Sequence, residues 1–307
     1  MIEVNHVSKR YGDRVAVEDL TFTVQPGVVT GFLGPNGAGK STTMRLILGL
    51  DRPSSGTATV AGRSYLDLRA PLHEVGAMLE ARAIHTGRSA RNHLLALAQT
   101  HGIPDRRVDE VIDIVGLTGV ARKRVGSFSL GMGQRLGIAV ALLGDPHTVI
   151  LDEPANGLDP EGIRWIRTLL MELAREGRTV FLSSHLMSEI QQSAEHLIVI
   201  GRGRLIEDAP MADFVTRASA DAPVRVRGPQ LTALAEAILA AGAVSVEPEP
   251  EGDALRVQGL GAEQIGEAVA AERLVLYELT PLQVTLEEAF MSLTHDSIEY
   301  QPTGAAT

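Results

Sequence analysis

The chain has 307 residues, enough for a sizeable core and for two domains. Its formal net charge is −10 and its isoelectric point about 5.4, a balance that argues against a nucleic-acid-binding surface, which needs a basic patch. The sequence contains no cysteine, which excludes disulfides and thiolate metal sites and favours a reducing compartment such as the cytoplasm.

Membrane and export signals are missing from the pattern. The first residues, MIEVNHVSKRYG, lack the basic start and apolar run of a signal peptide. No apolar stretch approaches the ~18 to 20 residues of a spanning helix. We therefore expect any membrane role to come through a partner.

The first part of the chain alternates strand and helix patterns. Residues 2–7 and 20–25 predict strands, and the apolar run 28–34 predicts a third that ends in glycine. Residues 40–50 have apolar side chains on one helical face. A strand, a glycine-rich turn and a helix in this order indicate an α/β phosphate-binding unit.

Helical patterns dominate residues 81–144, and strands follow at 148–152 and 178–184. Polar residues stand at the carboxyl ends of both strands, where ligands bind in parallel sheets. A hairpin pattern at 196–210 closes the domain near residue 215.

The composition changes at 218–223 (ASADAP), which predicts a larger domain over 1–217 and an accessory domain over 218–307. The second domain has a strand–helix–strand–strand–helix–strand pattern, with its last strand at 273–279, and resembles a ferredoxin-like fold. A final helix is expected at 285–294 and a loose tail at 301–307.

The segment GPNGAGKS matches the phosphate-loop pattern G-x-x-x-x-G-K-[ST] in full. Its glycines let backbone N–H groups surround a β-phosphate, and the following helix directs its positive end at the same anion. Chance would produce the four fixed positions in about one chain in a hundred of this length. We expect ATP to bind to Gly34, Pro35, Asn36, Gly37, Ala38, Gly39, Lys40, Ser41 and Thr42, with Lys40 on the β- and γ-phosphates and Ser41 on Mg²⁺.

Asp152 is the last residue of the predicted strand TVILD, and Glu153 follows it directly. Two adjacent carboxylates there are hard to explain by packing, because desolvating a charge is costly. Asp152 can hold Mg²⁺ or its water, and Glu153 can orient the attacking water and accept its proton. The alternative is a solvated pair at a strand end, which the phosphate loop disfavours.

With these motifs, residues 1 to about 215 resemble the ATP-binding subunits of ABC transporters. The segment FSLGMGQRLG is a variant of the family signature LSGGQ, with Ser129 and Gly131 at matching positions, Leu130 for the first glycine and Met132 for the glutamine. Serine and glycine amides at a helix start form a second anion site, although serine there is most often only a cap. The resemblance implies a mixed-sheet core, an antiparallel β subdomain and a helical subdomain at about 81–135.

The resemblance also assigns roles to single residues. It implies that Tyr11 stacks on adenine, that His185 contacts the γ-phosphate and that Asp159 in NGLDP crosses a dimer interface. Most members carry glutamine where this chain has Glu80, a position that senses Mg²⁺ and couples to the permease; a carboxylate can also ligate the ion. Glu80 and the SLGM variant are similar to the bacitracin- and daunorubicin-type drug-export subgroup.

The function implied is ATP hydrolysis that powers substrate movement, as export of a drug, antibiotic or lipid-like compound, through a separate membrane permease. Two ATPase domains, in a homodimer or with a sister subunit, would pair head to tail, each site taking Ser129 and Gly131 from the opposite subunit. Met132 of the same signature segment is also expected to contact the nucleotide. The protein would then lie on the inner face of the cell membrane, held by its permease, without a nucleic-acid partner.

Two other functions stay open at this point. A soluble ABC ATPase in assembly, nucleic-acid or ribosome work is disfavoured by the single ATPase domain and the acidic balance. A non-hydrolysing nucleotide sensor is disfavoured because Glu153 and His185 are both present. The C-terminal domain could bind a regulator or a small molecule, or stabilise a dimer.

Overall fold

The computed structural model describes residues 1–80, 84–220, 222–249 and 252–282, together with 287 and 290. It divides into two compact units, the first over Met1–Met211 and the second beginning at Ala212. None of the helices in the described residues has the length and apolar character of a membrane span. The helix expected at 285–294 lies mostly, and the tail at 301–307 entirely, outside the described residues.

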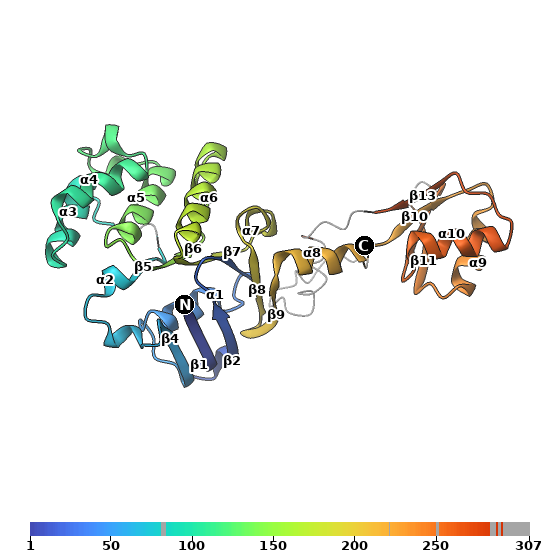
Figure 1. Ribbon diagram of the computed structural model, residues 1–307, viewed down its shortest axis with the longest axis horizontal. Helices are drawn as coiled ribbons and strands as arrows, with labels where there is room; N and C mark the ends of the chain where they lie inside the picture. Colours follow the sequence, from blue (N-terminus) through green and yellow to red (C-terminus); the bar gives the residue numbers. More distant parts are fainter. Residues whose placement is uncertain (81–83, 221, 250–251, 283–286, 288–289, 291–307) are drawn as a thin grey trace. The chain divides into compact units, whose positions relative to one another are not determined.

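A three-stranded antiparallel sheet starts the first unit (Figure 1). Its order is β2-β1-β4, and its strands are β1 (Ile2–Tyr11), β2 (Arg14–Val24) and β4 (Ser55–Val60). β1 and β2 are longer than the patterns predict, because strand pairing continues through three register shifts to the turn beyond Tyr11. The residues on either side of this turn, Tyr11 and Arg14, line the same cavity as residues 35–42.

The second sheet has six strands in the order β5-β6-β7-β3-β8-β9. Strands β5 to β8 and β3 run parallel, while β8 pairs with β9 in an antiparallel hairpin. The bounds are β3 (Val29–Leu33), β5 (Val75–Met78), β6 (Thr148–Asp152), β7 (Thr179–Ser184), β8 (His196–Gly201) and β9 (Arg204–Pro210). The carboxyl ends of β3, β6 and β7 therefore meet at one edge.

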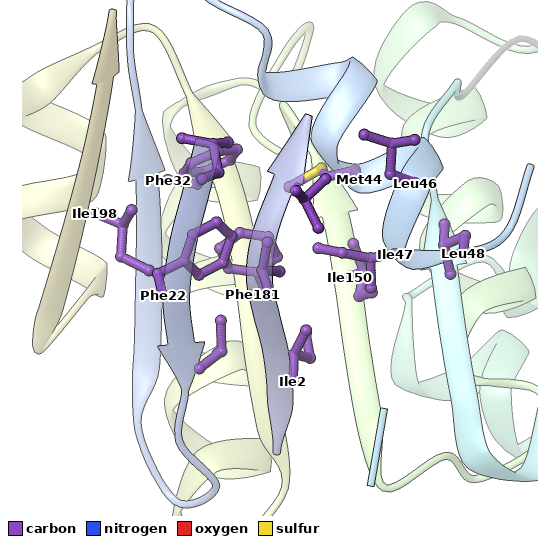
Figure 2. Packing of buried hydrophobic residues seen from close by; sticks show 14 of the residues in the cluster. Ile2, Phe22, Phe32, Met44, Leu46, Ile47, Leu48, Ile150, Phe181 and Ile198 are labelled. Atoms are coloured by element: carbon purple, nitrogen blue, oxygen red, sulfur yellow. The ribbon is translucent and has the colours of Figure 1, made fainter. Parts of the chain in front are cut away.

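The main hydrophobic cluster joins the antiparallel sheet, the six-stranded sheet and helix α1 (Lys40–Ile47). Phe22 of β2, Phe32 of β3 and Phe181 of β7 form a tilted aromatic group with ring centroids 5.1–5.9 Å apart (Figure 2). Met44 and Ile47, on the inner face of α1, pack against the same cluster. The helix that starts at the phosphate loop is thus anchored by burial of its apolar face.

Helices form the middle of the first unit, and the periodicity predicts those that lie within residues 81–144. They are α2 (Pro71–Glu74), α3 (Ala90–Thr100), α4 (Asp105–Ile114), α5 (Leu130–Leu142), α6 (Pro160–Arg175) and α7 (Met187–Ser193), with 3₁₀ turns η1 (Tyr65–Asp67), η2 (Thr118–Val120) and η3 (Val125–Ser127). Serine or aspartate side chains cap three of them, at Ser89, Ser129 and Asp159. The mixed sheet, antiparallel sheet and helical segment confirm the fold class.

The second unit contains α8 (Met211–Ala220) and a four-stranded antiparallel sheet of order β11-β12-β10-β13. The elements follow as β10 (Val224–Arg227), α9 (Leu231–Ala240), β11 (Ser245–Pro248), β12 (Leu255–Gln258), α10 (Ala262–Ala271) and β13 (Glu278–Pro281). This is the strand and helix order expected from the sequence. Leu234, Ile238, Ile265 and Val269 of the helices share one core with the sheet.

Two details differ from the expectations. The strand predicted at 273–279 begins only at Glu278, where pairing with Arg227 of β10 starts, although Leu274 and Leu276 already pack against the core. The composition change at 218–223 overlaps the end of α8, whose residues Met211 and Phe214 are buried. The proposed domain boundary at 217 and 218 therefore falls inside a helix.

We expect Gly76→Ala to destabilise the first unit. A Cβ on Gly76 of β5 would collide with the carbonyl oxygen of Ala141 in α5, so the strand and helix would have to separate. Overpacking of this kind costs about 1–3 kcal/mol and should lower the melting temperature clearly. Gly119→Ala is the control, since nothing lies within 4 Å of its added Cβ; equal melting of the two variants would contradict the close packing.

Candidate active site

The loop between β3 and α1 lines a cavity with its backbone. Gly37 and Gly39 have φ of 84° and 107°, in the region that favours glycine. A Cβ on Gly39 would also lie 2.7 Å from the carbonyl oxygen of Ala16 in β2, so the loop has no room for a side chain there. The structure therefore gives this loop the open backbone that its glycines predict, at the N-terminus of α1.

Lys40 is the buried cation of this loop, with a side chain only 7% exposed. Its Nζ donates to the carbonyl oxygens of Gly34 at 2.6 Å and Pro35 at 3.3 Å. Burial lowers the pKa of Lys40, and the charges of Glu153 and Asp152 act in the opposite direction. The ammonium group is thus held beside the loop and two carboxylates.

A hydrogen-bonded chain connects α1, β6 and β7. Ser41 Oγ donates to Asp152 Oδ2 at 2.7 Å, and Ser183 Oγ donates to Asp152 Oδ1. Ser183 Oγ also accepts from the backbone N–H of Glu153 at 3.1 Å. Because Ser183 is fully buried, it holds both acidic residues in fixed positions.

Glu153 has an unusual backbone and a hydrogen-bonded carboxylate. Its φ is 51°, a left-handed conformation that costs energy outside glycine and is found at functional sites. Its Oε2 lies 2.8 Å from His185 Nδ1. Burial raises the pKa of Glu153, and the hydrogen bond with His185 partly offsets that rise.

Gln134 and Ser183 support Glu153, and sequence analysis missed both. The side-chain amide of Gln134 in α5 donates to the carbonyl oxygens of Glu153 and Pro154, each at 3.0 Å. Gln134 is buried, and its place among the apolar residues of α5, where Arg135 is the other polar side chain, was the signal that could have revealed it. Ser183 is one of the polar residues at the carboxyl end of the predicted strand 178–184, but its bonds to Asp152 and Glu153 could not be predicted, because those partners follow another strand.

A cavity of about 680 Å³ opens over the phosphate loop. It is lined by Tyr11, Arg14, Val15, Ala16, the loop residues 35–42, Asp152, Glu153 and Arg202. Tyr11 is half-exposed; its hydroxyl donates to Asp51 Oδ2 at 2.9 Å, and Lys9 Nζ lies 4.8 Å from its ring centroid. The expectations did not include Arg14, the first residue of β2, or Arg202, in the turn between β8 and β9.

Ser129, Gly131, Met132 and Asp159 do not line this cavity. Ser129 Oγ accepts from the N–H of Met132 at 3.2 Å, and Asp159 Oδ1 accepts from the N–H of Gly162 at 2.8 Å, so both residues cap helices. A Cβ on Gly131 would lie 2.9 Å from the carbonyl oxygen of Gly157, which places the two helix starts side by side. Within one chain, these residues are therefore separate from the phosphate loop.

Glu80 lies beyond β5, exposed, and is not among the residues that line the cavity. Met78 of β5 pairs with Leu151 of β6 in a parallel arrangement. Glu80, after β5, and Asp152, at the end of β6, therefore lie at the same edge of the sheet. The structure thus brings Glu80 near the acidic strand end but not onto the phosphate loop.

The oxygens of Ser41 and Asp152 suit Mg²⁺. Two adjacent ligands of an octahedral ion at ~2.1 Å are about 3 Å apart, close to the 2.7 Å between these two atoms. No group of three or more His, Cys, Asp or Glu side chains that could hold a metal occurs among the described residues. An ion here would complete its shell with phosphate oxygens and water, as Mg²⁺ does.

Comparison with known proteins agrees with this site. The family model for ABC transporters matches residues 17–156, and a model for a domain of unknown function matches 222–287. The chain is 44% identical to the bacitracin transport ATP-binding protein BcrA of Bacillus licheniformis over 68% of this chain and 70% of that protein. It is 33% identical to the uncharacterized ABC transporter ATP-binding protein YhcH of Bacillus subtilis, over 97% of both chains.

Solved structures share the fold. The ATP-binding subunit of an ABC transporter superposes with a TM-score of 0.65 and 27% identity, over 71% of this chain and 92% of that one. A dimeric ATP-binding cassette bound to ADP and phosphate has a TM-score of 0.63 at 23% identity, over 69% and 99%. The phosphate loop, the acidic end of β6 and these relatives together show that the chain belongs to the ATP-binding subunits of ABC transporters and is an ATPase.

Proposed function

We propose that the chain hydrolyses Mg²⁺-bound ATP to export a drug, antibiotic or lipid-like compound through a separate membrane permease. The pairing of Glu153 with His185 next to Lys40 and Asp152 is the observation that supports hydrolysis. Relatives named for bacitracin transport, lantibiotic transport and Nod factor export support this class of cargo. The chain would then work at the inner face of the membrane, held there by its permease.

Each residue of the site has a distinct role in this proposal. Lys40 and the N–H groups of residues 36–42 bind the phosphates, and Tyr11 stacks on the base. Glu153 accepts a proton from water as the water oxygen bonds to the γ-phosphorus and the bond to ADP breaks. His185 orients the Glu153 carboxylate and the γ-phosphate. Mg²⁺, held by Ser41 and Asp152, would neutralise charge on the phosphate oxygens.

The signature segment completes the site of a second copy. Ser129, Gly131 and Met132 lie outside their own chain's cavity, yet they form a capped helix start, which favours an anion. Asp159 begins the neighbouring helix at the same surface. ATP that contacts both chains favours the closed pair, and hydrolysis removes that preference. Glu80, at the sheet edge beside Asp152, would sense the nucleotide and couple it to the permease.

The first test is Mg²⁺-dependent ATP turnover by the purified chain and by Glu153→Gln. We expect the variant to lose about a hundredfold or more of its rate while it still binds ATP, because the amide cannot accept the proton. It should also form a dimer in ATP, measured by size-exclusion chromatography. Glu236→Gln, an exposed substitution on α9, is the control. Unchanged turnover in Glu153→Gln would contradict Glu153 as the base.

The stability of Glu153→Gln relative to the wild type should increase with pH. Because the folded-state pKa of Glu153 is raised, the folded chain holds its proton more tightly than the unfolded chain does. Stability is therefore lost as pH rises from the ordinary glutamate value through the folded-state value, and Glu153→Gln removes this loss. We expect its melting temperature to exceed that of the wild type more at about pH 8 than at about pH 5. A difference independent of pH, or of opposite sign, would argue against the buried carboxylate.

Ser129→Arg tests the shared site. In the Glu153→Gln background, we expect the added arginine to leave the ATP affinity of the monomer within about threefold and to abolish the ATP-dependent dimer. Loss of the helix cap costs about 1 kcal/mol, which thermal melting would show. Thr168→Arg, on the exposed face of α6, should dimerise normally. If Ser129→Arg instead loses ATP binding as a monomer, the segment belongs to its own chain's site.

A further inference from the structure

The turn between β8 and β9 places an arginine at the nucleotide cavity. Gly201 pairs with Arg204, so Arg202 and Gly203 form a two-residue hairpin turn. Their φ angles are 48° and 78°, both positive, as the type I′ turn requires. Asn-Gly is the favoured pair in this turn, and arginine at its first position is conformationally unfavourable. Its presence there calls for another reason.

The turn is attached to the phosphate loop. The N–H of Gly203 donates to the carbonyl oxygen of Ala38 at 2.9 Å, and the N–H of Glu18 donates to the carbonyl oxygen of Gly203 at 2.8 Å. A Cβ on Gly203 would lie 2.7 Å from the carbonyl oxygen of Ala16, so β2 and the turn are in close contact. Next to the turn, Arg204 forms a two-contact ion pair with Glu18 of β2. Arg202 is therefore held in position relative to the loop.

The charged side chains that line the cavity favour binding of an anion near Arg202. Among the described residues that line it, the cations are Arg14, Lys40 and Arg202, and the carboxylates Asp152 and Glu153 are at the hydrolytic end. The whole chain carries a net charge of −10, so a group of cations here stands against the general balance. A guanidinium group binds phosphate oxygens with charge-assisted hydrogen bonds.

We infer that Arg202 is a nucleotide-binding residue, whose guanidinium group binds the phosphate chain of the nucleotide held by the phosphate loop of the same chain. The inference rests on the proposed nucleotide site and adds a residue from outside its sequence motifs. Arg202 contributes to affinity and not to the chemical step, since Glu153 and His185 occupy the hydrolytic end. The left-handed conformation at residue 202 is tolerated because the attached turn fixes it.

Arg202→Asn separates binding from folding. Asparagine suits the left-handed position better than arginine, so the variant should melt at the same temperature as the wild type or higher. Loss of the guanidinium group should raise the dissociation constant for Mg²⁺-bound ADP about tenfold and, by competition, that for Mg²⁺-bound pyrophosphate by a similar factor. Turnover at saturating ATP should stay within about twofold of the wild type.

The chain offers a matched control in Arg273, which is exposed and also has a positive φ, 54°, in the second unit. Arg273→Asn makes the same chemical change and should leave both dissociation constants unaltered. Arg202→Lys keeps the charge and should bind more tightly than Arg202→Asn. Equal affinity of Arg202→Asn and Arg273→Asn would overturn the inference, and weaker ADP binding with unchanged pyrophosphate binding would overturn the assignment to the phosphates.

Lys40→Ala, measured in parallel, separates this inference from the proposed function. If the wild type binds ADP and Lys40→Ala does not, the nucleotide site is in place, and a normal Arg202→Asn refutes only the role of Arg202. If the wild type binds neither ADP nor pyrophosphate, the proposed nucleotide site itself fails.

Discussion

Parallel strands put their carboxyl ends at one edge of a sheet, and the site depends on the cross-links made there. Ser41 at the start of α1, Asp152 at the end of β6 and Ser183 near the end of β7 are joined by hydrogen bonds through one carboxylate. Each residue comes from a different element, so the arrangement exists only when β3, β6 and β7 are in register. The aromatic group of Phe22, Phe32 and Phe181 packs β2 against β3 and β7 and so helps to hold these two strands in place. Burial of apolar surface therefore supplies the rigidity that the polar site requires.

Glu153, in contrast, lowers the stability of the folded chain. It has a left-handed backbone and a carboxylate whose pKa burial raises, and a chain selected only for stability would keep neither. Two neighbours hold it in place: Ser183 accepts from its N–H, and Gln134 donates to its carbonyl oxygen. A raised pKa makes the carboxylate a stronger base once it is ionised, which suits proton transfer from water. The structural cost and the benefit to the proposed proton transfer thus arise from the same burial.

The starts of α5 and α6 form a second polar surface that the phosphate-loop cavity leaves unused. Gly131 allows the carbonyl oxygen of Gly157 to approach, and Leu130, the residue that departs from the signature pattern, packs against Gly157. Leucine in place of glycine thus makes a contact within the chain while its own side chain stays half-exposed. Arg135 lies 4.3 Å from the ring centroid of Trp165 in α6, and Trp165 Nε1 donates to the carbonyl oxygen of Ile114 in α4. The first turns of α5 therefore contact α6 and the loop before it, at Gly157 and at Trp165.

The sequence alone determined the phosphate loop, the acidic end of β6, the order of the elements and the family, because each depends on residues close together in the chain or on a short-range period. The glycines of the loop and the apolar face of α1 act locally, so their effect can be inferred from spacing. Only the tertiary structure decided that Ser183 and Gln134 support Glu153, that Arg202 reaches the cavity and that Glu80 lies outside its lining. It also decided that β13 begins at Glu278, where pairing with β10 becomes possible. These features depend on contacts between residues distant in sequence, whose geometry is set by strand register and helix packing, and no local pattern encodes it.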